Sequence, residues 1–135
     1  MTYRFLDHTA DALAECQGAT LEDLLESAAH ALYAVAFRAT QARIDLDEVI
    51  EVAGENREEV LVRWLQELIY LMEVRYFVAS VFQFERVGDT VVKARVAGYT
   101  YHPDERDAEV KAATYHEMAI KETEEGLATR ILFDL

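Results

Sequence analysis

Two segments of the chain repeat apolar residues at the 3.6-residue period of an amphipathic helix. The first begins after Gly18 with Thr20, and the second begins after Gly54 with Asn56, and both Thr and Asn are good N-cap residues. Acidic residues follow each cap, where the helix dipole favours negative charge. The pattern therefore predicts two amphipathic helices. Their apolar positions are Leu21, Leu24, Leu25, Ala28, Ala29, Leu32 and Tyr33 in the first, and Val60, Leu61, Trp64, Leu65, Leu68, Leu71 and Met72 in the second.

The other patterned segments are rich in β-branched and aromatic residues, which is typical of strands. Gly88-Asp89 suits a two-residue hairpin turn, and Gly126 can supply the positive φ of a tight connection. Because each helix must bury its apolar stripe against a sheet, we predict an α+β fold. It has a mainly antiparallel or mixed sheet of about six to seven strands, with both helices packed on one face. The expected strands cover residues 3–6, 12–17, 44–52, 78–87, 90–97, 109–122 and 127–135.

Length, charge and cysteine content narrow the class of protein. The 135 residues fit one domain, spanning positions 1–135. A formal charge of -13 repels nucleic-acid backbones, so direct nucleic-acid binding is not expected. The single cysteine, Cys16, excludes an internal disulfide and a cysteine-based zinc cluster. No secretory leader and no apolar run of about 20 residues is visible, so we expect an intracellular, cytoplasmic protein that does not enter membranes.

Acidic residues stand at both ends of the chain where the apolar pattern leaves no obvious place for them. Asp11 closes the segment 7–11, and Asp134 lies between the apolar run 131–133 and the carboxylate of Leu135. If the first and last strands are neighbours, these carboxylates repel one another by roughly 4 kcal/mol per pair at about 4 Å, and a hard divalent cation would remove that cost. For Asp11, pattern alone favours a simpler interpretation, in which it caps a turn. Asp134 is harder to explain as a turn residue, although an acid at a frayed chain end is ordinary.

Other polar residues have both a structural and a functional interpretation. His8 and His116 could join a metal site, but no zinc-ligand spacing is present, which favours structural histidines. Lys111 is a solvent charge on the strand 109–122 unless it lies near the carboxylates, where it could hold a phosphate or a partner's acid. The chain has no nucleophile elbow and no phosphate-binding glycine loop. No motif therefore requires an enzyme.

The chain carries His-Thr-Ala-Asp near the start, Val-Lys-Ala-x-Thr-Tyr-His in the late strand, and an acid one residue from the end. These motifs are the most specific parts of five segments that, taken jointly and in order, resemble the archease family. The resemblance implies a non-catalytic, metal-binding accessory protein. Such a protein promotes guanylylation and multiple turnover of an RtcB-type RNA ligase in tRNA splicing and RNA repair. The five segments are residues 7–11, 20–28, 61–71, 109–116 and 131–135.

The same resemblance implies the residues of the site. Asp11, Asp134 and the terminal carboxylate of Leu135 are the expected metal ligands, for calcium or alternatively magnesium or manganese. Lys111 and His8 are expected to contact the ligase or its nucleotide. The runner-up function is a general chaperone-like modulator of nucleic-acid enzymes that has no metal requirement. A small hydrolase built on the paired acids ranks last, because the sequence shows no nucleophile.

Overall fold

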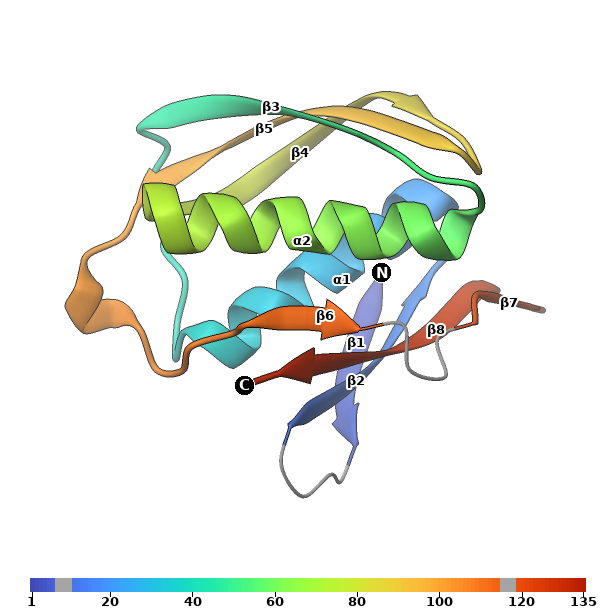
Figure 1. Ribbon diagram of the computed structural model, residues 1–135, viewed down its shortest axis with the longest axis horizontal. Coiled ribbons are helices and arrows are strands. Elements are labelled where there is room, and N and C mark those ends of the chain that lie inside the picture. The colour runs from blue at the N-terminus through green and yellow to red at the C-terminus, as the bar shows by residue number, and fades with distance from the viewer. Residues whose placement is uncertain (7–10, 115–118) are drawn as a thin grey trace.

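The computed structural model describes residues 1–6, 11–114 and 119–135. In these residues, two antiparallel sheets enclose two helices between them (Figure 1). The elements, in chain order, are β1 (Thr2–Leu6), β2 (Ala12–Gly18), α1 (Leu21–Ala36), β3 (Leu46–Ala53), α2 (Arg57–Arg75), β4 (Phe77–Val87), β5 (Val91–Thr100), the short 3-10 helix η1 (Pro103–Glu105), β6 (Ala112–Thr114), β7 (Lys121–Thr123) and β8 (Gly126–Asp134).

Both predicted helices are present and begin at the predicted caps. The Thr20 side chain accepts a hydrogen bond from the Asp23 backbone N–H at 3.2 Å, and the Asn56 side chain accepts one from the Glu59 N–H at 2.9 Å. Each bond satisfies a helix N–H that has no partner within the helix. α2 is followed by Tyr76 in the left-handed conformation, with φ 57°. Neither helix combines the length and apolar character that a membrane crossing requires among the residues described.

The strands divide into two sheets rather than the single sheet expected. One sheet has the order β1-β2-β8-β6, with β7 also paired to β8, and the other has the order β3-β5-β4. All pairs are antiparallel, which confirms the α+β class. The alternation of residues along a strand reports which of its faces is buried, but not which strand lies beside it. The pattern therefore predicted the strands without predicting that they form separate sheets on either side of the helices.

The predicted strand 109–122 is wrong in extent. In its described part, only residues 112–114 and 121–123 are strands, and both pair with β8. By contrast, the hairpin at Gly88-Asp89 joins β4 to β5 as predicted, and Gly126 has φ 131°. The β-branched and aromatic composition of residues 109–122 indicated a strand, which is correct for residues 112–114 and 121–122, but it carried no signal for where the pairing stops.

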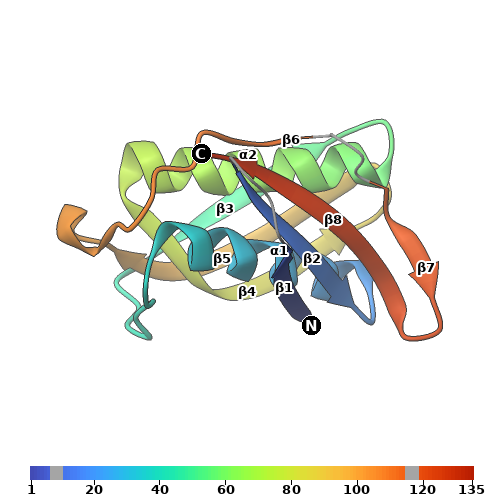
Figure 2. The ribbon, with the colours of Figure 1, turned by 90° about the horizontal axis from the view of Figure 1, so that it is seen from below.

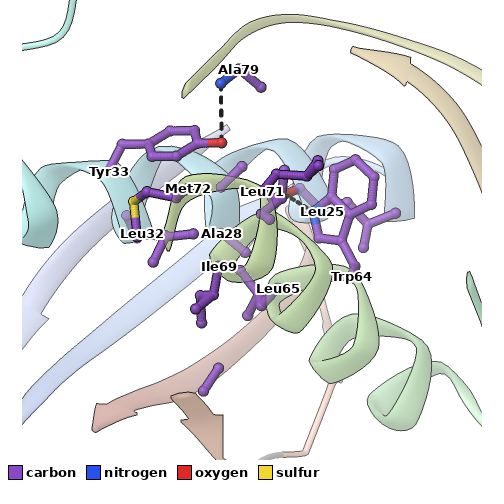
Figure 3. Close-up of a cluster of buried hydrophobic side chains, with 14 of the residues drawn as sticks. Leu25, Ala28, Leu32, Tyr33, Trp64, Leu65, Ile69, Leu71, Met72 and Ala79 are labelled. Atoms are coloured by element: carbon purple, nitrogen blue, oxygen red, sulfur yellow. Dashed lines mark hydrogen bonds between the residues drawn. The ribbon is translucent and has the colours of Figure 1, made fainter. Parts of the chain in front are cut away.

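The core lies between the sheets and is held together by polar anchors as well as by apolar contacts (Figure 3). The Trp64 side chain on α2 is fully buried, and its Nε1–H donates to the Leu25 carbonyl of α1 at 3.0 Å. The Tyr33 hydroxyl of α1 accepts a hydrogen bond from the Ala79 N–H of β4 at 3.1 Å. Because buried polar groups are costly when unpaired, these two bonds fix how α1 sits against α2 and β4.

Cys16, in β2, is buried, and we expect its thiol to be inert in the folded protein. Burial raises its pKa from 9.0 to about 12, although the neighbouring Ser27 hydroxyl lowers it somewhat. The unfolded chain therefore releases this proton at lower pH, so the contribution of Cys16 to stability should fall as pH rises from 9 toward 12. Maleimide labelling at neutral pH should need urea, and stoichiometric labelling of native protein would contradict the buried position.

Candidate functional site

The pairing of β2 with β8 brings the start of β2 beside the C-terminal end of the chain. Ala12 lies opposite Phe133, so Asp11 and Asp134 occupy the next positions in the same register. Directly opposite residues of an antiparallel pair share a face of the sheet. Figure 2 shows the C-terminal end of β8 beside the start of β2. The strand that follows Asp11 and the strand that ends at Asp134 are therefore neighbours in the fold, as the expected cation site requires.

Lys111 lies on the other side of β8 from Asp11. β6 pairs with the end of β8, with Ala112 opposite Asp134, and the Lys111 backbone N–H donates to the Asp134 carbonyl at 2.8 Å. Leu135, the next residue, is partly exposed. One end of this sheet thus gathers Asp11, Asp134, Leu135 and the backbone of Lys111, which come from opposite ends of the sequence.

The Asp134 carboxylate faces solvent, Asp11 is partly exposed, and neither has a basic side chain of the described residues beside it. Phe133 is buried against the helices, so alternation directs the neighbouring Asp134 to the outer face, where it is exposed. Among the residues described, no basic nitrogen lies within 4.0 Å of the carboxylate of Asp11 or Asp134, and the Lys111 ammonium pairs with no acid. The negative charge of the two aspartates is therefore not neutralised by the described part of the chain itself.

The donors present fit an oxygen-preferring cation, but they do not form a complete metal site. Carboxylate oxygens suit calcium, magnesium and manganese, and calcium takes about six to eight oxygen ligands. Within the ranges described, no group of three or more His, Cys, Asp or Glu side chains is placed to hold a metal. Asp11 and Asp134 supply two carboxylates, and the terminal carboxylate of Leu135 would supply a third. His8 and His116 lie outside the described residues.

A cavity that the sequence analysis missed lies elsewhere in the molecule. It has a volume of about 710 Å³ and is bounded by the start of β1, one face of α1, the segment 37–42 and the start of β4. Aromatic side chains, including Tyr3, Tyr33 and Phe37, contribute to its lining, and none of the predicted site residues does. Its walls come from segments far apart in the sequence, so no local pattern could have indicated it.

The chain is similar to known proteins over nearly its whole length. Residues 3–135 match the model of the Archease protein family (MTH1598/TM1083). The chain belongs to the archease family. It is 34% identical to protein archease of Archaeoglobus fulgidus over 137 residues, which cover 100% of both chains. It is 31% identical to protein archease of Methanosarcina mazei over 139 residues, covering 98% of this chain and 95% of that one. The predicted family is thus confirmed.

Solved structures share the archease fold. The solution structure of Methanobacterium thermoautotrophicum protein 1598 superposes with a TM-score of 0.79 at 29% identity, covering 98% of each chain. The crystal structure of a Thermotoga maritima archease, described as a possible chaperone, gives a TM-score of 0.68 at 22% identity. That comparison covers 96% of this chain and 94% of the other. The arrangement of two sheets around two helices in this archease is therefore that of the family.

Proposed function

We propose that this archease is a non-catalytic accessory protein that promotes guanylylation and multiple turnover of an RtcB-type RNA ligase in tRNA splicing and RNA repair. The observation that carries the proposal is the register of β2 with β8, which sets Asp11 and Asp134 side by side without a neutralising cation among the described residues. Family membership and the net charge of -13 support it. The proposed location is the cytoplasm.

In this proposal, Asp11, Asp134 and the terminal carboxylate of Leu135 hold a divalent cation, which is calcium, or alternatively magnesium or manganese. When bound, the cation supplies positive charge that attracts phosphate oxygens. The aspartates hold and orient it from two neighbouring strands, whose hydrogen bonds keep their backbones in place. Lys111 offers an ammonium group to the ligase or its nucleotide, and His8 has the same proposed role.

The acidic surface is proposed to select the state of the ligase that archease binds. A ligase channel that holds RNA must be basic, and a chain with a charge of -13 is attracted to such a channel when RNA is absent. Binding to the RNA-free enzyme would then favour the conformation that accepts the nucleotide. Archease itself contributes no nucleophile, which agrees with the absence of catalytic motifs from its sequence.

Changing Asp11 or Asp134 to asparagine should reduce stimulation of ligase guanylylation to the level of the ligase alone, because each change removes one carboxylate from the cation site. In chelator, the variants should melt at or above the wild-type temperature, since like-charge repulsion is relieved. Calcium at about 100 times its Kd should stabilise wild type by about 2.7 kcal/mol and the variants much less. The readouts are guanylylation from GTP, calcium titration calorimetry and thermal unfolding.

The matched control is Glu124→Gln, which removes an exposed carboxylate from the β7–β8 turn without touching the sheet end. It should stimulate like wild type. Full stimulation by both aspartate variants, with unchanged calcium binding, would reject the metal-dependent proposal. That result would instead favour a chaperone-like modulator without a metal requirement, which is the second candidate because the Thermotoga maritima relative is described as a possible chaperone.

A further inference from the structure

β3 is an edge strand whose outer side is open. It pairs with β5 alone, through eight consecutive positions from Leu46 to Ala53 without a register shift. The opposite edge of this sheet, β4, has two irregularities of the kind that β-bulges produce. The described edges of the other sheet are shorter, with five residues in β1 and three in β6. Among the edge strands of the described residues, β3 is therefore the longest that pairs without a register shift. A long, regular edge strand is the kind most suited to pairing with another strand.

A groove separates this edge from α2, which runs along the sheet (Figure 1). Its volume is about 480 Å³, and it is lined by residues 51–53 of β3 and by Arg63, Gln66, Glu67 and Tyr70 of α2. These four helical positions are three or four residues apart, so they form one face of α2. An open strand edge beside a parallel helix can hold an extended peptide, whose backbone pairs with the strand while its side chains contact the helix.

The charges of the groove specify what kind of segment it accepts. Asp47 and Glu48 on β3 are already paired, with Arg95 at 3.0 Å and with Arg75 at 3.1 Å. Arg63 is likewise paired to an acid one helical turn away. The lining acids that remain without an ion pair among the described residues are Glu51 and Glu67, so an incoming basic segment meets attraction that is not already satisfied.

Glu51 of β3 and Glu67 of α2 both line the groove. Neither carboxylate has a basic nitrogen within 4.0 Å in the part of the chain that is described. Tyr70 beside them is 51% exposed, and its ring can stack on a lysine or arginine side chain. Val49 on β3, also about half exposed, lies on the same face of the strand as Glu51 and offers an apolar contact there.

We infer that β3 and α2 form a docking site for an extended, lysine- or arginine-bearing segment of a partner protein, which adds to β3 as a further strand of its sheet. A second copy of this chain fits poorly, because two chains of charge -13 repel each other and their β3 acids would be juxtaposed. β3 lies on the opposite side of the helices from β8 (Figure 1), and the site does not depend on the ligase proposal.

The test uses a fluorescent peptide of about ten residues in which lysine alternates with valine, long enough to pair with all eight residues of β3. Full-length protein should bind it saturably, and hydrogen exchange of β3 amides should slow. The double variant Glu51→Lys with Glu67→Lys should bind roughly tenfold more weakly, since two charge pairs are lost and reversed. Tyr70→Ala should also weaken binding.

The control variant is Glu124→Lys with Glu125→Lys in the β7–β8 turn, which changes the net charge equally and should bind like wild type. A peptide with proline replacing every valine retains the lysines but lacks half of the backbone donors, so it should bind much more weakly. Equal loss of binding in both double variants, or equal binding of the proline peptide, would reduce the interaction to general charge attraction and overturn the inference. Failure of the lysine–valine peptide to bind would do the same.

Discussion

Replacing Gly98 with alanine should lower the free energy of unfolding by at least about 3 kcal/mol. Gly98 lies in β5 opposite Ala79 of β4, where a Cβ would stand 1.8 Å from the carbonyl oxygen of Val78. That contact is with backbone, which cannot rotate away as a side chain can. The strands would have to separate at the point where the Asp45 N–H also donates to the Gly98 carbonyl at 2.7 Å. Urea unfolding followed by circular dichroism measures the loss.

Gly88→Ala is the matched control for this substitution. Gly88 lies in the turn between β4 and β5, and a Cβ there would meet nothing within 4 Å. Its free energy of unfolding should stay within about 0.5 kcal/mol of wild type. Equal unfolding midpoints for the two variants would show that β4 and β5 are not packed as closely at Gly98 as the structure has them.

Replacing Trp64 with alanine should cost about 3–5 kcal/mol of stability, the range typical of removing a large aromatic side chain from a core. The Trp64 ring centroid lies 5.6 Å from that of Phe84 and 6.1 Å from that of Phe82, and the side chain is fully buried. Its loss would leave a cavity between α2 and β4 and would remove the hydrogen bond to the Leu25 carbonyl. Differential scanning calorimetry and urea unfolding should agree on the size of the effect.

Trp64→Phe separates packing from hydrogen bonding. Phenylalanine keeps an aromatic ring in the core but has no N–H to donate, so we expect a cost of about 1–2 kcal/mol. If alanine and phenylalanine destabilise the protein equally, the hydrogen bond to Leu25 rather than the burial of the ring determines the contribution of this position. A loss below about 1 kcal/mol in Trp64→Ala would contradict the buried position itself.

The helices could be predicted from sequence because their signals are local. Thr20 and Asn56 cap helices whose apolar faces repeat within a few residues, and both caps are formed. The hairpin at Gly88-Asp89 is local in the same sense. The division into two sheets could not be predicted, because it depends on which strand lies beside which. β3, for example, pairs with β5, which follows it only after the whole of α2 and β4.

The candidate site was only partly predictable for the same reason. Asp11 and Asp134 stood out because charges interrupted an apolar pattern. They lie close together only if their strands are neighbours, and the strand order could not be predicted from the sequence. Lys111 was singled out from its place on the predicted strand 109–122 and again from the resemblance, but its backbone contact with Asp134 depends on β6 pairing with β8. The groove beside β3 gave no local signal. Glu51 and Glu67 lie far apart in the sequence, and each looks like an ordinary charged residue on the polar side of its own element.

The position of β8 within its sheet determines when the acidic sheet end can form. β8 inserts between β2 and β6, so the hairpin of β1 and β2, although made early in synthesis, lacks its neighbour until residues 126–134 have been added. A nascent or truncated chain that lacks β8 can pair β1 with β2 and still have nothing opposite Asp11. Interrupted translation would thus yield a product without the paired aspartates. Only a chain in which β8 has paired with both β2 and β6 can have the activity proposed for archease.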